Sequence, residues 1–138
     1  MALDEDLRTE IIAASTTLGT RVHQNIVPEH QGNTFPRCWF QRISQEDLLA
    51  VDGSRIDLKR TEYTVEFISE DIDEAIAAAN AVAEHTDQGG LLAKRGTFGA
   101  GTVQGVFITD QDDDYQPRGI GADEGAHVSA LAITIWST

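Results

Sequence analysis

The sequence is poor in cysteine, in basic residues and in long apolar runs. Cys38 is the only cysteine among 138 residues, so no disulfide can form within one chain. Lys and Arg total 10 against 23 Asp and Glu, which gives a formal net charge of −13. The first residues are acidic, and no stretch has the length and apolarity of a signal peptide or a membrane span. We therefore expect a soluble, intracellular protein that does not enter a membrane.

The shortage of basic residues is greatest in the second half of the chain. From Glu70 onward, 12 acidic residues face only Lys94, Arg95 and Arg118, a net charge of −9, whereas the preceding residues have a net charge of −4. A protein that grips nucleic acid by releasing counterions needs clustered Lys and Arg. The composition argues against such binding and is typical of a soluble, self-repelling surface.

Motifs for catalysis or metal binding are also missing. The four histidines lack metal-ligand spacing, no serine stands in a G-x-S-x-G elbow, and Cys38 beside Trp39 and Phe40 is expected to be a buried, inert thiol. Asp110, Asp112 and Asp114 have the spacing of a calcium loop, but no glycine is placed for its turn and Gly121 stands where the bidentate glutamate should be. We expect no catalytic residue, cofactor or metal.

Two different periodicities follow each other between Leu58 and Thr86. Residues 61–67 alternate, with Tyr63, Val65 and Phe67 on one face, which predicts a half-buried strand. From Asp71 the apolar residues recur at steps of three and four, which predicts an amphipathic helix over 71–86 with an Asp71–Glu74 capping box. A strand is therefore expected to lead into a helix that packs over a sheet.

The remaining periodic segments complete an α+β domain over residues 1–138. A helix is predicted over 4–18, and further strands over 36–43, 102–109 and 126–136. The connections are predicted over 24–35, 44–57 (a hairpin with a turn at Asp52-Gly53), 91–101 (glycine-rich) and 110–124 (acidic). The expected fold is a mostly antiparallel four-stranded sheet with helices packed on one face, in the order α-β-β-α-β-β.

In their order and spacing, these elements resemble the tail-terminator or tail-completion proteins of long-tailed bacteriophages and gene transfer agents. The resemblance covers the whole chain and is carried by residues 21–23, 36–43, 63–69, 71–85, 103–108, 112–117 and 134–136. The chain departs from the family in its glycine-containing 91–101 insert and its Asp-rich 110–114 segment.

The resemblance implies a structural virion protein and not an enzyme. Such subunits assemble in the host cytoplasm, usually as a hexameric ring on the head-proximal end of the tail tube, where they stop tube polymerisation and provide the head-tail joining surface. The implied partners are further copies of the chain, the tail tube protein and the head-tail connector proteins. DNA would only pass through the lumen, where acidic side chains would repel its phosphates.

We expect the two longest polar excursions, residues 44–59 and 110–124, to make the subunit and tube contacts. For the two tryptophans, the sequence leaves open whether a neighbouring copy covers them or whether they lie in the core of the monomer. The candidate interface residues are Trp39, Asp52, Arg55, Asp110, Asp112, Asp113, Asp114, Tyr115, Arg118 and Trp136.

Besides a tail terminator, the sequence leaves two alternative functions open. One is a head-tail connector subunit on the capsid side of the joint, which the sequence separates poorly from a terminator. The other is a small acidic binding module or enzyme of the same α+β build, which a pocket with convergent polar groups would favour.

Overall fold

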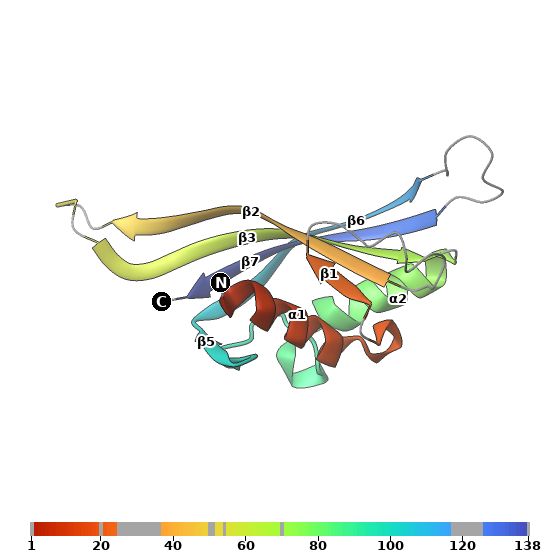
Figure 1. Cartoon of the computed structure of the whole chain (residues 1–138), viewed down its shortest axis with the longest axis horizontal. Coiled ribbons are helices and arrows are strands. Elements are labelled where there is room, and N and C mark those ends of the chain that lie inside the picture. The colour runs from red at the N-terminus through yellow and green to blue at the C-terminus, as the bar shows by residue number, and fades with distance from the viewer. Residues whose placement is uncertain are drawn as a thin grey trace.

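A five-stranded sheet with the strand order β1-β2-β3-β7-β6 forms the body of the protein (Figure 1). Together with two α-helices, it confirms the predicted α+β class. The computed structural model describes residues 2–19, 21–24, 37–49, 52–53, 55–69, 71–116 and 126–137. The strands of this sheet are β1 (Val22–Gln24), β2 (Arg37–Leu49), β3 (Arg55–Ser69), β6 (Gly105–Gln116) and β7 (Ala126–Ser137).

The predicted four-stranded antiparallel sheet is incomplete. β2, β3, β7 and β6 are antiparallel neighbours, but β1 adds a fifth strand that runs parallel to β2. A separate two-stranded sheet pairs β4 (Gly96–Phe98) with β5 (Gly101–Val103), inside the segment predicted to be a glycine-rich connection. Both additions are three residues long, too short to leave a periodic pattern in the sequence.

Helix α1 (Ala2–Ala14) ends four residues earlier than predicted, and a 3₁₀ turn η1 (Thr16–Leu18) continues it. The predicted apolar stripe is correct, because Leu3, Leu7, Ile11 and Leu18 are all buried. Helix α2 (Ile72–Ala83) also ends earlier than predicted, and a second 3₁₀ turn η3 (Thr86–Gln88) follows it.

The predicted capping box at the start of α2 is only half formed. Asp71 is the N-cap, and its Oδ1 accepts a hydrogen bond from Asp73 N at 3.0 Å. Glu74 does not reach back to Asp71, since its Oε1 accepts from Ser69 Oγ at 3.0 Å. The end of β3 is thereby tied to the first turn of α2.

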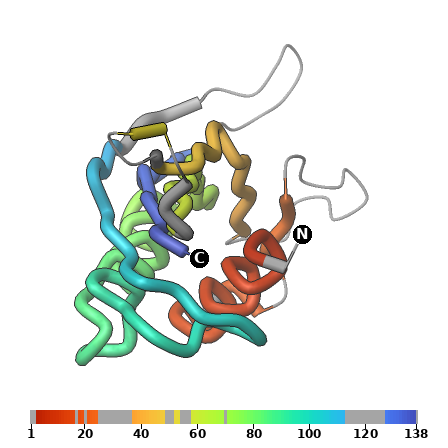
Figure 2. The backbone as a smooth tube through the Cα atoms, turned by 90° about the vertical axis from the view of Figure 1, so that its left-hand side faces the viewer, coloured from red at the N-terminus to blue at the C-terminus, as the bar shows by residue number. Residues whose placement is uncertain are grey.

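Both helices lie on the same side of the sheet, which leaves a two-layer arrangement (Figures 1 and 2). The alternating side chains of β3 and β7 that face them, including Tyr63, Val65, Leu131 and Ile133, are almost fully buried. They join the apolar residues of α1 and α2 in one hydrophobic core. Burial of this one face accounts for the alternation seen in the sequence.

The strands are longer than predicted, so two segments interpreted as connections are largely sheet. β2 and β3 stay paired up to Leu49 and Arg55, so residues 44–49 and 55–59 form a long two-stranded arm, and Asp52 and Gly53 lie in a turn. β6 reaches Gln116, so Asp110 to Tyr115 are strand residues and not a loop. The rest of the predicted 110–124 connection, and residues 25–35 of the predicted 24–35 loop, lie outside the described residues.

Candidate interaction surface

The face of the sheet opposite the helices is the candidate site, and we call it the open face. It is formed at its centre by Glu62, Thr64 and Glu66 of β3, paired with Thr134, Ala132 and Ala130 of β7, all half-buried. In the described part of the chain, no helix packs on this face (Figure 1). An antiparallel sheet can keep such a face in water or use it to contact another protein.

Two large apolar side chains stand out at the borders of the open face. Ile43 of β2 is 56% exposed and Phe107 of β6 is 48% exposed. Among the described residues, these are the exposed large hydrophobic side chains. Gly105 lies two positions before Phe107, and a Cβ added there would come within 3.2 Å of the Phe107 ring. The glycine therefore leaves room for this ring at the surface.

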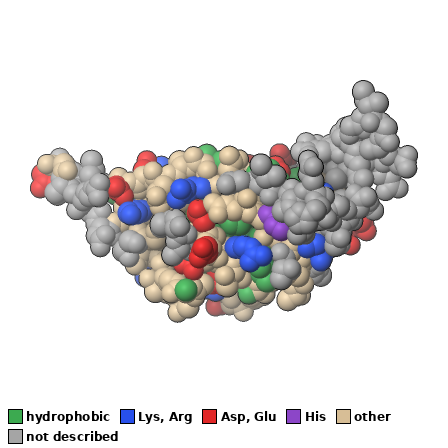
Figure 3. Space-filling view, in the orientation of Figure 1, with side chains coloured by type: hydrophobic (Ala, Val, Ile, Leu, Met, Phe, Trp, Pro, Cys, Tyr) green, Lys and Arg blue, Asp and Glu red, His purple; other side chains and the backbone are tan. Residues whose placement is uncertain are grey.

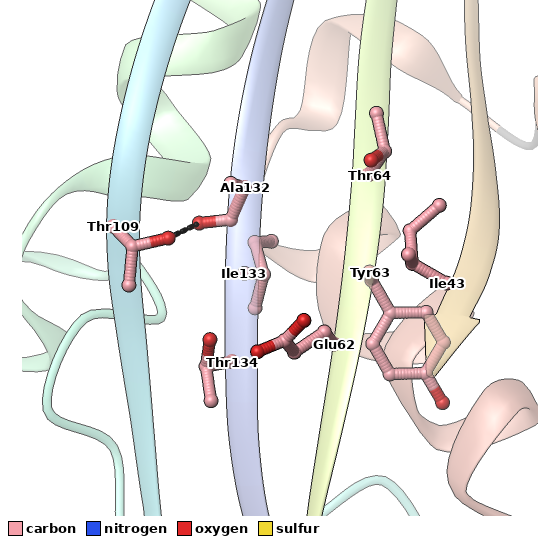
Figure 4. A pocket seen from close by; sticks show the side chains of 8 residues that line it. All are labelled: Ile43, Glu62, Tyr63, Thr64, Thr109, Ala132, Ile133 and Thr134. Atoms are coloured by element: carbon pink, nitrogen blue, oxygen red, sulfur yellow. Dashed lines mark hydrogen bonds between the residues drawn. The ribbon is translucent and has the colours of Figure 1, made fainter. Parts of the chain in front are cut away.

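The middle of the open face is hollowed because its floor is made of small side chains. A depression of about 390 Å³ lies between Ile43 and Thr109 over Ala132 (Figure 4). It adjoins a second depression of about 210 Å³, bordered by Asp110 and Asp112, because both share Thr64 and Ala132. A third, more apolar hollow of about 420 Å³ is lined by Leu58, Gln104, Gly105, Phe107 and Trp136.

The open face is predominantly acidic. Glu62 and Glu66 on β3 and Asp110 and Asp112 on β6 border the small-residue floor. Arg60 offsets part of this charge, because its guanidinium lies 2.5 Å from Glu46 Oε1 and 3.8 Å from Glu62 Oε1. The same guanidinium stacks 5.9 Å from the centre of the Trp136 ring. The Arg60 guanidinium is thus already in contact with side chains of the open face.

The two predicted tryptophans both belong to the open face. Trp39 pairs with Glu66, and Trp136 pairs with Arg60, so both side chains point away from the helices and are half-buried. They stand at different heights along the strands. Neither is part of the core formed between sheet and helices.

The other predicted interface residues fall into two groups at opposite ends of the sheet. Asp52 is exposed at the tip of the arm, and Arg55 begins β3 beside it. Asp110 and Asp112 are exposed on β6, followed by Asp113, Asp114 and Tyr115, whose backbone is described and paired with β7. Arg118 lies outside the described residues. Asp112 therefore lies at the same level of the sheet as Trp39, with β7 and β3 between them, and not beside the arm.

The calcium-like spacing of Asp110, Asp112 and Asp114 is explained by strand geometry. These residues pair in turn with Ala132, Ala130 and Val128, so they occupy successive positions on one face of β6. Same-face neighbours in a strand are separated by roughly 7 Å, too far to wrap one ion as a loop does. Among the described residues, no three His, Cys, Asp or Glu side chains gather in a way that could hold a metal ion.

The sequence reading missed Ile43 and Phe107. Phe107 lies between Val106, which is buried, and Ile108, which is half-buried. Because all three residues are apolar, the sequence does not show that Phe107 faces outward. Ile43 lies at the irregularity in pairing between Arg42 and Ser44. Strict alternation from the buried Val106 would have placed Phe107 on the open face.

Among the described residues, two titratable groups have clearly shifted pKa values, and both lie on the helix side of the sheet. Burial, with a smaller contribution from the Glu66 carboxylate, raises the pKa of Cys38, which confirms the predicted buried thiol. Burial and a hydrogen bond to Asp4 raise the pKa of Tyr63 well above its usual value. The side chains of Cys38 and Tyr63 both lie on the helix side of the sheet. The negative charge of the open face therefore comes from the carboxylates named above.

No protein-family model matches the chain, and no curated protein sequence matches it. Among the described residues, no helix has the length and apolarity needed to cross a membrane.

Proposed function

We propose that this protein is a phage-type tail terminator, a structural subunit that caps the head-proximal end of a tail tube. The observation that carries the proposal is the open face, a sheet surface without a helical layer that has an exposed apolar residue at each border. Because an antiparallel sheet can keep one polar face in water, the support comes from the two exposed apolar side chains at the borders of this face. Repeated copies and the end of a protein tube are partners that would cover its borders.

The paired arm of residues 44–59 supports a contact with a neighbouring protein. It extends β2 and β3 beyond the helical layer (Figure 1), and its strands stay paired up to Leu49, with a register shift between Asp47 and Leu49. A free two-stranded ribbon has little stability in water by itself. Contact with the tube or with an adjacent subunit would stabilise it, which agrees with the predicted role of this excursion.

The charge of the open face supports a position around a DNA passage. Acidic side chains lining a ring would repel phosphates and let a genome pass without binding. Charge reversal of Asp110→Lys and Asp112→Lys should leave the fold intact, since both side chains are exposed. If the face lines the lumen, this variant should bind duplex DNA in a salt-sensitive manner, whereas the unaltered protein should not.

The proposal is tested by adding the purified protein to growing tail tubes of the cognate tube protein. We expect tube length to stop increasing and an additional ring, near six subunits, to appear at one end in electron micrographs. An acidic protein of similar size and charge is the matched control for non-specific effects. In the virion, antibodies should label the head-proximal end of the tail.

The outcome also separates the alternatives. Continued tube growth with the protein absent from tube ends would overturn the terminator proposal. Binding to the capsid connector in the same preparation, without any effect on tubes, would place the protein on the capsid side of the joint.

A further inference from the structure

The three hollows of the open face follow one strand, β7. The smallest is lined by Ala130 and Ala132, the middle one by Ala132 and Thr134, and the apolar one by Trp136. These residues occupy alternate positions of β7, so their side chains lie on the same face. Together the hollows form a trough with a floor of small side chains that ends at Trp136, and we call it the β7 trough.

The β7 trough has the width and length of an α-helix. Its walls are the side chains of β3 and β6, the two strands that neighbour β7, and Figure 4 shows Ala132 between Thr64 and Thr109 of these strands. Neighbouring strands are about 4.8 Å apart, so the walls are separated by roughly 10 Å, close to the diameter of a helix. From Ala130 to Trp136 the trough runs for about 20 Å, or about 13 helical residues.

Both walls of the trough carry negative charge. Glu62 and Glu66 lie on the β3 wall, and Asp110 and Asp112 lie on the β6 wall. Residues 62–66 and 107–112 contain no Lys or Arg. Figure 3, in which the sheet lies uppermost, shows acidic and hydrophobic side chains along the upper outline of the molecule. A ligand that fills the trough is therefore expected to carry positive charge on both of its flanks.

The end of the trough at Trp136 is apolar. Leu58, Phe107 and Trp136 line this hollow, and the Phe107 ring is exposed there. A sheet face that only meets water has no need of such a hollow, since it can carry polar side chains throughout. A large apolar side chain from a partner would cover the Phe107 ring and act as the anchor of the contact.

We propose that the β7 trough docks an amphipathic helix of another protein. Lys or Arg side chains on the two flanks of this helix would face the four carboxylates, and one large apolar side chain would enter the hollow at Trp136. The contact is of the helix-in-groove kind, in which an apolar stripe of the helix lies against the floor. This inference goes beyond the proposed function and does not depend on it.

Charge and shape favour this occupant over a second copy and over DNA. Helix α1 has four acidic residues and one arginine, and α2 has two acidic residues and no base, so neither helix of a second copy supplies the required charge. Both helices also use their apolar stripes in their own core. Duplex DNA would be repelled by the four carboxylates and has no apolar side chain for the hollow. A docked helix and a DNA passage are therefore alternative uses of this charge.

A synthetic peptide tests the proposal. The probe is an alanine-based peptide of about 14 residues, with Lys on both flanks, one Leu near an end and a lactam bridge on its outer face, because an unconstrained helix of this length is marginally stable. The control peptide has the same composition with the Lys and Leu positions shuffled. We expect calorimetry to show about tenfold tighter binding of the probe. Equal affinity for both peptides, or no binding of the probe, would overturn the proposal.

Charge reversal separates the trough from the general acidity of the protein. Asp110→Lys with Asp112→Lys should weaken binding of the probe by about tenfold, since two attractions become repulsions. Glu84→Lys with Asp87→Lys, at exposed positions after α2, changes the net charge equally and should leave the affinity unchanged. Circular dichroism and thermal melting show whether both variants keep the fold. Equal losses of affinity in two folded variants would mean non-specific attraction and would overturn the proposal.

The apolar end is tested through Phe107. Phe107→Ser should weaken binding of the probe but leave unchanged the weaker binding of a probe with Ala in place of Leu, because only the Leu reaches the hollow. Equal effects on the two probes would contradict the placement of the apolar side chain. Tube capping is measured separately. Specific binding of the probe without capped tubes would support this inference and overturn only the terminator role.

Discussion

Asp6 of α1 accepts a hydrogen bond from the backbone N–H of Ala100, with 2.9 Å between Oδ1 and N. The two residues are 94 positions apart, and the contact fixes the helix to the turn between β4 and β5. Asp6 is 7% exposed, so its carboxylate depends on this turn for a partner.

Gly99 makes this contact possible, and replacing it should be costly. A Cβ at Gly99 would lie 2.6 Å from Asp6 Oδ1 and 2.7 Å from Asp6 Cα, and the residue has a φ of +57°. We expect Gly99→Ala to lower the free energy of unfolding by about 2–4 kcal/mol, from the clash together with the backbone strain. Urea unfolding measures the change.

Gly96→Ala is the control for Gly99→Ala. Gly96 also has a positive φ, +86°, but nothing lies within 4 Å of an added Cβ. Its substitution should cost only about 1 kcal/mol, the conformational part. Equal losses for the two variants would show that the approach of Asp6 is not what requires Gly99.

The phenol of Tyr63 donates a hydrogen bond to Asp4, which predicts a loss of stability in alkali. Burial, then the hydrogen bond and charge of Asp4, raise the pKa of Tyr63, while Arg42 lowers it slightly. In the unfolded chain tyrosine titrates near a pKa of about 10. Above that pH the unfolded state loses a proton that the folded state keeps, so the free energy of unfolding falls by up to ~1.4 kcal/mol per pH unit.

Tyr63→Phe checks the sign of this dependence. The variant should be less stable at neutral pH by about 1–2 kcal/mol, since Asp4 keeps only its 2.7 Å hydrogen bond from Gln24 Nε2. Above about pH 10 its stability should fall less steeply than that of the unaltered protein. Cys38, whose raised pKa acts in the same direction, is present in both proteins and cancels in the comparison. Identical slopes would contradict the prediction.

Helix α2 offers a local test of its N-cap. Asp71→Ala removes the acceptor for Asp73 N and should lower the free energy of unfolding by about 1 kcal/mol. Asp73→Ala removes an acid from the same first turn without removing the cap, so only a few tenths of a kcal/mol are expected. If thermal melting ranks the two variants equally, the side chain of Asp71 does not cap the helix.

The sequence predicts the parts of this fold in which one face of an element is buried. Alternation in β3 and β7 identified Tyr63, Val65 and Leu131 on the core side, and the helical spacing of Leu7 and Ile11 identified the buried stripe of α1. These patterns exist because burial is set by the face on which a residue lies. Class, helices and long strands follow from them.

What the sequence could not predict depends on partners distant in the chain. The arm and the second half of β6 are polar, so their strand state comes from pairing with a neighbour and not from a buried face. Likewise no pattern in the sequence indicates that Asp4, Asp6 and Glu10 of α1 are buried. The sequence indicates only part of the candidate surface, namely Trp39, Trp136 and the aspartates. It does not indicate Ile43 and Phe107, because only their exposure in the structure distinguishes them from the other apolar residues.

A third buried acid of α1, Glu10, forms an ion pair with Lys94. Its Oε1 lies 2.6 Å from Lys94 Nζ, and the Glu10 side chain is only 11% exposed. Lys94→Ala should cost about 2 kcal/mol, because the carboxylate loses its partner where water reaches it poorly. The double variant Glu10→Gln with Lys94→Met replaces both charges and should be less destabilised than Lys94→Ala, since no unpaired charge remains. The urea midpoints of the unaltered protein, of Lys94→Ala and of the double variant measure these differences. If the double variant is less stable than Lys94→Ala, the attraction between Glu10 and Lys94 dominates at this site, and not the cost of an isolated carboxylate.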